Sequence, residues 1–530
     1  MKPTETRSRL HRSLTITVSA ITLAAGVGAA QAAHDPVPAE PSIAQVQKDF
    51  AAGRYNVRAL ERHYQARIAT IDRGGPKVNS VIEVNPDAAK LAAALDASGN
   101  HSLPLFGVPV LLKDNIDTGD AMLTTAGSLA LAGSKPAGDA FIVKRMREAG
   151  ALILGKTNLS EWANFRSTHS SSGWSGRGGQ THNPYALNRN PCGSSSGSGA
   201  SIAADLAVVA IGTETDGSIV CPSSANGLVG IKPTIGLVSR SGIVPISVSQ
   251  DTAGPMTRSV ADAATLLTVI AGYDPNDPAT EAIKNRAPVD YRQFLDANSL
   301  KGIRIGVMRQ HMGFNAEIDA LFEHALDVLR AHGAVIVDPA NVPTQGKFEE
   351  DERTALLYEF KDGLNRYLAT RSPGSPRTLA DLITFNTTEK DREMPNFGQE
   401  LFLSAQAKGA LTEKEYVEAH ERGPRLAGPE GIDAALNKDN LDVLIAPTGG
   451  PAWTTDWVNG DHFAGGATSS APAVAGYPHV TVPMGLVRGL PIGLSFVGAA
   501  WSEPKLISYA YAFEQATHLR QAPRFIATIQ

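Results

Sequence analysis

Residues 303–337 contain a strand, a helix and a second strand in a pattern that leaves little freedom in how they pack. The apolar run IRIGV predicts the first strand, and VIV predicts the return strand. Between them, Asn315 is a suitable helix N-cap and Gly333 a suitable helix end. The inward face of the predicted helix consists of Ile318, Leu321, Phe322, Ala325 and Leu329. A strand that returns after one helical crossover lies parallel to the first, so this stretch predicts a βαβ unit.

The same alternation of apolar strands and helices continues along the chain. PLFGVPVLLKDNID predicts a strand that ends at Lys113, and ALILG, DVLIAPT, HVTVPMG and IGLSFVG predict four more. Strands as apolar as these are buried on both faces. The chain is therefore predicted to be α/β, with a single large mixed β-sheet core covered by helices on both faces. Residues 346–430 are charged, mostly helical in pattern and punctuated by Pro and Gly, and we interpret them as an insertion that shapes the substrate site.

Residues 1–32 have the layout of a secretory signal peptide. Four basic side chains precede an apolar stretch over residues 14–30, and the small-residue pattern AQA follows at residues 30–32. An uncleaved anchor is the alternative, but Thr, Ser and Gly dilute this short stretch. Cleavage after Ala32 would leave residues 33–530 as one domain. We expect that domain to be exported to the periplasm or the extracellular space, with no stable membrane insertion after cleavage.

Charge and composition exclude several classes of partner. Cleavage would remove four basic side chains and one acidic side chain, which takes the formal net charge from −5 to −8. A mildly acidic chain without a basic run argues against nucleic acid or anionic lipid as a partner. The 13 histidines and two cysteines form no metal-binding motif, so no metal and no cofactor is predicted.

Two short motifs match well-known patterns but do not fit their mechanisms. GALILGKT, residues 150–157, has the phosphate-loop spacing, but its middle residues are a buried strand where that loop needs a flexible cradle. GSSSG matches the nucleophile elbow of α/β-hydrolases, with Ser195 as nucleophile and Asp442 and His479 available as partners. That elbow follows a strand, whereas HNPYALNRNPC before it reads as a loop. An esterase that uses Ser195 is kept as an alternative.

A third pattern joins three separate places: Lys113 in GVPVLLKDNID, Ser194 in PCGSSSGSG and Ser218 in GTETDGSIVCPSS. The order Lys, Ser, Ser and the 24-residue step between the serines resemble the amidase signature family, hydrolases with a Ser–cis-Ser–Lys triad. The phrases TTAGSLAL, GKTNLSEWANF, GLVGIKPTIGLVSRSGIVPIS and DTAGPMTRSVAD are similar to that family too. The resemblance covers roughly residues 45–520 and implies the amidase signature fold and an amide-hydrolysing activity.

The resemblance also implies a role for each of these residues. Ser218 would be the nucleophile that forms an acyl-enzyme. Ser194, preceded by a cis peptide bond from Gly193, would pass the proton of that nucleophile to Lys113. Ser195 would support the loop through its hydroxyl. The oxyanion would be met by main-chain N–H groups of the segment that we call the nucleophile loop: Thr215, Asp216, Gly217 and Ser218.

Lysine can act as a base only when it is uncharged. Its ordinary pKa of about 10.4 leaves roughly one lysine in ~10³ neutral at pH 7, and burial can lower that pKa by as much as ~3–5 units. The apolar run PVLLK ends at Lys113 and can supply such burial. The sequence therefore predicts a buried Lys113 with a lowered pKa.

The nucleophile loop departs from the commoner family pattern G-[ST]-D-T-G-G-S-I-R. Glu214 stands in place of Asp, Asp216 in place of the first glycine, and Val220 in place of Arg, so the Asp–Arg pair of that pattern is lost. The segment TETDGS resembles the corresponding segment in the branch of the family that removes the C-terminal amide from peptides. We therefore expect a peptide or small-molecule amide substrate. The alternatives are an amidase for fatty or aryl amides and a secreted binding protein on a catalytically retired amidase scaffold.

The two cysteines flank the two serines. Cys192 lies two residues before Ser194, and Cys221 lies three residues after Ser218. If the serines converge, the cysteines lie on neighbouring loops, and an exported protein can form a disulfide there. A bridge also needs Cα atoms within roughly 7 Å and suitably directed Cβ atoms, which the spacing does not guarantee. We predict two free, buried thiols.

Overall fold

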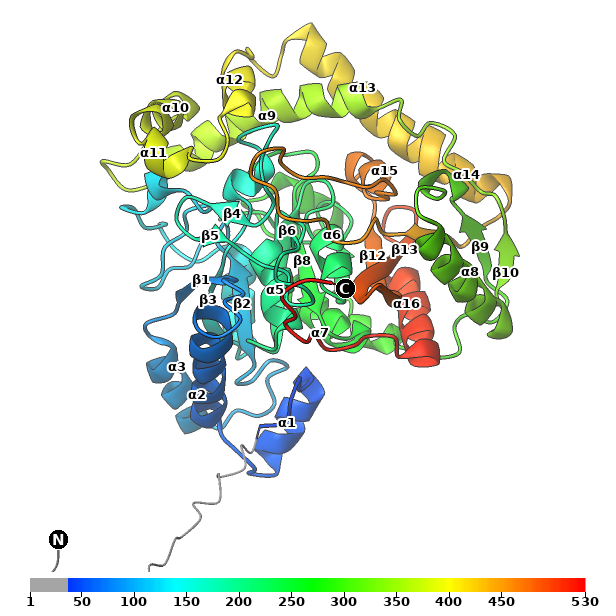
Figure 1. The fold of residues 1–530 in the computed structure, drawn as a ribbon, viewed down its shortest axis with the longest axis horizontal. Helices are drawn as coiled ribbons and strands as arrows, with labels where there is room; N and C mark the ends of the chain where they lie inside the picture. The colour runs from blue at the N-terminus through cyan, green and yellow to red at the C-terminus, as the bar shows by residue number, and fades with distance from the viewer. Residues whose placement is uncertain (1–36, 530) are drawn as a thin grey trace, which may run out of the picture. The chain divides into compact units, whose positions relative to one another are not determined.

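An 11-stranded sheet runs through the protein in this computed structural model, which describes residues 37–529 (Figure 1). The strand order is β1-β3-β2-β6-β8-β7-β12-β13-β11-β9-β10. The strands are β1 (Val81–Val84), β2 (Pro109–Lys113), β3 (Leu152–Thr157), β6 (Val209–Glu214), β7 (Val229–Lys232), β8 (Thr252–Thr257), β9 (Arg304–Val307), β10 (Val335–Val337), β11 (Val443–Pro447), β12 (His479–Val487) and β13 (Leu490–Val497). A separate small pair consists of β4 (Trp174–Ser175) and β5 (Gly179–Gln180). The predicted signal peptide lies outside the described residues.

The sheet is mixed, as predicted. β2 runs parallel to β3 and β6, and β9 runs parallel to β10 and β11. The pairs that join β8, β7, β12, β13 and β11 in the middle of the sheet are antiparallel. Every residue of β2, β3, β6, β7, β8, β11 and β13 is buried, which requires packing on both faces of the sheet.

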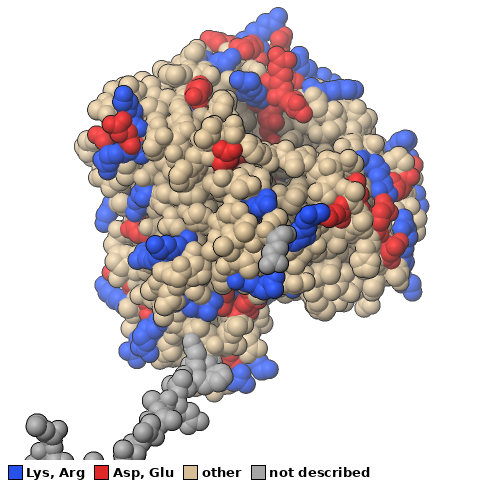
Figure 2. Space-filling view, viewed as in Figure 1, with Lys and Arg blue, Asp and Glu red and all other residues tan. Residues whose placement is uncertain are grey.

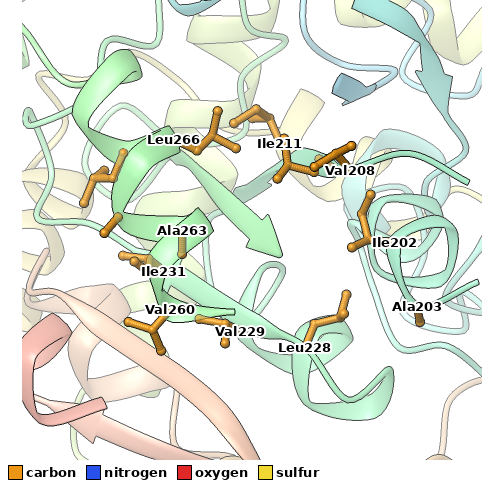
Figure 3. Close-up of a cluster of buried hydrophobic side chains, with 14 of the residues drawn as sticks. Ile202, Ala203, Val208, Ile211, Leu228, Val229, Ile231, Val260, Ala263 and Leu266 are labelled. Carbon is orange, nitrogen blue, oxygen red and sulfur yellow. The ribbon is translucent and has the colours of Figure 1, made fainter. Parts of the chain in front are cut away.

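Helices surround the sheet and provide that packing (Figure 1). They are α1 (Ile43–Ala51), α2 (Val57–Arg67), α3 (Ala88–Ser98), α4 (Phe141–Glu148), α5 (Ser196–Ala203), α6 (Val220–Ala225), α7 (Val260–Ile270), α8 (Ala316–Ala331), α9 (Glu349–Ala369), α10 (Leu379–Thr388), α11 (Lys390–Glu393), α12 (Glu400–Gln406), α13 (Lys414–Ala427), α14 (Asp433–Lys438), α15 (Ser470–Val474) and α16 (Glu503–Thr517). Figure 3 shows part of the resulting core, where apolar side chains of α5 and α7 lie around those of β6 and β7. This core packs around β6, the strand that leads into the nucleophile loop.

The predicted βαβ unit is confirmed. β9 and β10 are parallel, and α8 connects them. The Asn315 side chain caps α8 by accepting hydrogen bonds from the N–H groups of Glu317 and Ile318. Gly333 follows the helix with a φ of +88°, a left-handed conformation that glycine adopts without the steric cost of a Cβ.

Residues 346–430 contain helices α9 to α13, which arch along one side of the molecule (Figure 1). They have an apolar core of their own, in which Phe360 and Leu364 of α9 pack with Trp162 and Val244. The Glu393 carboxylate of α11 fastens this region to the sheet domain by accepting hydrogen bonds from the Ser128 hydroxyl and the Leu129 N–H. The helical segment is therefore packed directly on loops that extend from the sheet.

Candidate active site

Lys113 is the last residue of β2 and is fully buried. β2 and β6 are adjacent parallel strands, so their carboxyl ends place Lys113 beside Thr213. The Lys113 Nζ donates hydrogen bonds to the Thr213 Oγ1 at 2.8 Å and the Thr213 carbonyl oxygen at 3.1 Å. Its third partner is the Ser194 Oγ, also at 2.8 Å. The amine is thus held with its nitrogen against the Ser194 hydroxyl.

Burial lowers the pKa of Lys113 to about 7, because an ammonium ion loses its hydration in the apolar end of β2. The carboxylates of Asp251 and Glu214 oppose this shift but do not cancel it. A large fraction of Lys113 is therefore uncharged near neutral pH, as the apolar run before it predicts.

Ser194 is fully buried, and the Gly193–Ser194 peptide bond is cis, as the resemblance implies. Close packing around residue 193 leaves room only for glycine. A Cβ at this position would lie 2.2 Å from the Ser160 Oγ and 2.9 Å from the Ser172 Oγ. Any larger residue here would displace the loop that carries Ser194.

Ser218 lies in the turn between β6 and α6 and is 9% exposed. Its carbonyl oxygen accepts a hydrogen bond from the Ser195 N–H at 3.2 Å, which joins the nucleophile loop to the Ser194 loop. Within residues 37–529, the Ser218 hydroxyl and the N–H groups of the nucleophile loop make no hydrogen bond to another protein group. Several adjacent unpaired N–H groups form a ready-made anion site.

The substitutions that set this loop apart from the commoner family pattern have partners of their own. The Glu214 carboxylate accepts hydrogen bonds from the N–H groups of Ile219 at 2.7 Å and Val220 at 3.0 Å, which fixes the chain directly after Ser218. The Asp216 carboxylate accepts a hydrogen bond from the Ser470 hydroxyl at 2.9 Å. Hydrogen bonds from main-chain N–H groups to the Glu214 side chain therefore stabilise the loop, which lacks the Asp–Arg pair.

The comparisons with known proteins agree with this geometry. The family described as Amidase matches residues 60–507. The chain belongs to the amidase family. A protein of Arabidopsis thaliana named "Probable amidase" is 43% identical over 500 residues, which cover 92% of each chain. The solved structure of native peptide amidase from Stenotrophomonas maltophilia has a TM-score of 0.87 at 54% identity and covers 92% of this chain and 99% of that one.

A relative with a different named activity is also similar in sequence. One component of the glutamyl-tRNA(Gln) amidotransferase of Acinetobacter baumannii is 34% identical over 502 residues, which cover 91% of this chain and 97% of that protein. Together these relatives place the protein among the hydrolases of amide C–N bonds, on the amidase signature fold.

The two competing motifs do not form sites in this amidase. GALILGKT is occupied by β3, and the buried Lys156 Nζ donates to the carbonyl oxygens of Ile116 and Leu123, so no phosphate cradle exists there. The Ser195 hydroxyl is fully buried and exchanges hydrogen bonds with the main chain of Thr213. His479 is paired with the Ser495 hydroxyl within the sheet, so it does not serve Ser195 as a base.

The prediction of two free thiols is wrong. Cys192 and Cys221 form a disulfide, with Cα atoms 6.0 Å apart. The physical reason is the close approach of the Ser194 and Ser218 loops, which the Ser195 N–H to Ser218 carbonyl hydrogen bond holds together. The sequence placed the cysteines on neighbouring loops only if the two serines converge, and it did not give this distance.

Removing the disulfide should destabilise the protein. The cysteines are 29 residues apart in sequence, and loss of a native crosslink of this kind costs about 2–5 kcal/mol of folding free energy. We expect the double variant Cys192→Ala, Cys221→Ala to unfold at a lower temperature than the wild type in thermal scans without reductant. With reductant the two proteins should unfold at closer temperatures. Equal unfolding temperatures without reductant would contradict a stabilising bridge.

The sequence analysis did not identify Thr213, which contacts both Lys113 and Ser195. Its hydroxyl receives hydrogen bonds from the Lys113 Nζ and from the Asn115 side chain, and its main chain holds Ser195. A hydroxyl near the end of the apolar strand VAIGTE was the available signal. Its importance follows from the pairing of β6 with β2, which no local pattern specifies.

Two cavities border the site. The larger has a volume of about 770 Å³ and is lined by Asn115, Thr213 and Thr215, by residues 243–248 and by part of α9. The smaller, of about 240 Å³, borders Gly193, Gly217 and the disulfide. Both openings therefore lie next to the loops that carry the two serines.

Neither a membrane segment nor a metal cluster is present in the part of the chain that the structure describes. No helix of residues 37–529 is long and apolar enough to cross a bilayer. In the same range, no three His, Cys, Asp or Glu side chains are grouped so that they could hold a metal ion.

Proposed function

We propose that this amidase removes the C-terminal amide from peptides and releases ammonia, through an acyl-enzyme on Ser218. The observation that carries the mechanism is the buried 2.8 Å hydrogen bond between the Lys113 Nζ and the Ser194 Oγ, next to a loop with unpaired N–H groups. The 54% identity to a peptide amidase supports the choice of substrate.

The proposed reaction begins with proton removal from the nucleophile. The Ser218 oxygen attacks the carbonyl carbon of the amide, its proton moves to Ser194, and the proton of Ser194 moves to neutral Lys113. Ser194 then gives a proton to the amide nitrogen and regains one from Lys113, the C–N bond breaks, and ammonia leaves. A water molecule repeats the sequence on the ester of Ser218 and yields the peptide acid. No cofactor takes part in these steps.

The main-chain N–H groups of Thr215, Asp216, Gly217 and Ser218 are proposed to stabilise the oxyanion. Such donors contribute on the order of ~3 kcal/mol each when they are aimed at the developing charge. Because they are fixed in the turn between β6 and α6 and make no other hydrogen bond within the described residues, little reorganisation would be needed during the reaction.

Export to the periplasm or extracellular space is part of the proposal. The disulfide supports it, because disulfides persist in oxidising compartments. We also propose that the protein has neither a nucleic-acid partner nor a stable membrane insertion after cleavage of the leader. In support, basic and acidic side chains are interspersed on the face seen in Figure 2, without a broad basic surface.

Ammonia release from a panel of amides tests the proposed substrate. We expect peptide amides to be hydrolysed with the highest kcat/KM, and fatty and aryl amides to be hydrolysed much more slowly. Mass spectrometry of the products should show the peptide acid and no internal cleavage. Hydrolysis of fatty or aryl amides alone would contradict the peptide specificity, and absence of any hydrolysis would favour the retired binding protein.

A further inference from the structure

The smaller cavity has an aromatic wall. Trp453 and Phe463 line this cavity together with Gly193 and Gly217, which belong to the loops that carry the two serines. The two rings pack against each other, with centroids 4.6 Å apart and planes inclined by 55°. Tilted aromatic pairs of this kind present both a face and an edge to a third apolar group.

Hydrogen bonds hold the Trp453 ring in place, and Phe463 packs against it. The Trp453 indole N–H donates to the Asp461 carboxylate at 3.1 Å. The same carboxylate accepts a hydrogen bond from the Ser172 N–H at 3.0 Å, which ties the segment to the loop ahead of Ser194. Residues 449–468, which we call the aromatic loop, are anchored by main-chain contacts as well, such as the hydrogen bond from the Asn190 N–H to the Trp453 carbonyl oxygen at 2.7 Å. The Trp453 ring of the aromatic wall is therefore held in place by the protein itself.

Phe463 is unusually open to solvent for a large aromatic side chain. It is 63% exposed, although it lines the cavity and packs on the buried Trp453. An exposed aromatic side chain at the edge of a concave site is a common feature of ligand recognition. Its remaining surface is available to an apolar group that enters the cavity from solvent.

The position of the cavity identifies which part of a peptide amide would enter it. The cavity borders the peptide unit before Ser194 and the residue before Ser218, so it lies beside the carbonyl group that these serines would handle. In a peptide amide, the side chain of the C-terminal residue is one carbon away from that carbonyl. The volume of about 240 Å³ corresponds to roughly eight water molecules, which suits one large side chain better than an extended chain.

We propose that the Trp453–Phe463 pair forms the binding site for the side chain of the C-terminal residue, and that it selects aromatic and large aliphatic side chains. This inference rests on the proposed peptide-amide activity. The rest of the peptide would extend into the larger cavity of about 770 Å³.

Asp216 adds a second element of selection. It lines the same cavity, and its carboxylate is held there by the Ser470 hydroxyl. Burial raises the pKa of Asp216, so this part of the cavity disfavours negative charge, and an acidic side chain on the substrate would meet the same penalty. Selection would therefore combine apolar contact with exclusion of negative side chains.

Four dipeptide amides that differ only in the C-terminal residue test the inference: Phe, Leu, Ala and Asp amides. For the wild type, we expect kcat/KM for the Phe and Leu amides to exceed that for the Ala amide by about tenfold or more, with the Asp amide lowest. Phe463→Ala should lower kcat/KM for the Phe amide by about tenfold and leave the Ala amide within about twofold. Phe463→Tyr should keep the preference, because it keeps the ring.

Val458→Ala is the matched control. Val458 belongs to the aromatic loop and is 88% exposed, but it is absent from the cavity lining, so this variant should behave as the wild type. Equal kcat/KM for the Phe and Ala amides in the wild type would overturn the inference and leave the proposed function standing. An equal fall for both amides in Phe463→Ala would also overturn it. Failure of the wild type to release ammonia from any of the four would overturn both.

Discussion

Ser218→Ala should lose amide hydrolysis by a factor on the order of 10⁴ or more. The hydroxyl is the proposed nucleophile, and no neighbouring group can replace it, because Ser194 is fully buried against Lys113. Residual hydrolysis would come from the oxyanion site and substrate binding alone. Ammonia release from a peptide amide measures the loss, and an active-site fluorophosphonate should label the wild type at Ser218 and leave the variant unlabelled.

Two other serine variants are the controls for this result. Ser195→Ala removes a buried hydroxyl that exchanges hydrogen bonds with Thr213, so it should reduce activity by about tenfold at most. Ser194→Ala should leave a small residual activity. The double variant Ser194→Ala, Ser218→Ala should lose no more activity than Ser218→Ala alone, because the two residues act as one relay. Full activity of Ser218→Ala would reject Ser218 as the nucleophile. Labelling of the wild type at Ser195, together with an inactive Ser195→Ala variant, would favour the esterase that uses Ser195.

Lys113→Met should reduce kcat/KM by about 10³-fold or more. Methionine keeps the length and apolar stem of the side chain but removes the nitrogen that receives the proton from Ser194. General bases contribute typically ~10²–10⁴-fold, and loss of this one also breaks the relay to Ser218. Activity is measured per folded protein, because the Thr213 carbonyl oxygen loses a partner and the variant should be less stable.

Lys156→Met is the matched control for this variant. Lys156 is also fully buried, lies in the neighbouring strand β3, and donates to main-chain carbonyl oxygens. Burial lowers its pKa as well, so the two lysines share an environment and differ in their contact with Ser194. Lys156→Met should be destabilised but retain activity per folded protein within about tenfold. A comparable loss in both variants would mean that Lys113 acts only through stability.

The pH profile of the wild type provides an independent measurement of the same group. Lys113 accepts a proton only in its uncharged form, which predominates above its pKa of about 7. We therefore expect kcat/KM to be low in acid, to rise as pH increases through about 7, and to remain high above it. An acidic optimum would contradict a lysine base.

Local sequence patterns were sufficient for most of the architecture. The βαβ unit at residues 303–337 follows from its apolar periods and from the cap at Asn315, which act within a few residues of one another. The apolar residues before Lys113 can supply its burial, and the two serine motifs favoured a buried lysine over an exposed one at the strand end. The order Lys113, Ser194, Ser218 and the 24-residue step between the serines pointed to the family, which residues 60–507 match.

Other features depend on distances between segments that are remote in sequence, and these were decided by the tertiary structure. Thr213 became the partner of Lys113 because β6 lies next to β2 in the sheet, a choice of neighbour that neither strand encodes by itself. Cys192 and Cys221 form a bridge because their loops approach to 6.0 Å between Cα atoms, a separation that their spacing left open. The aromatic wall and Gly193 line one cavity for the same reason: more than two hundred residues separate them in sequence, and only packing brings them together.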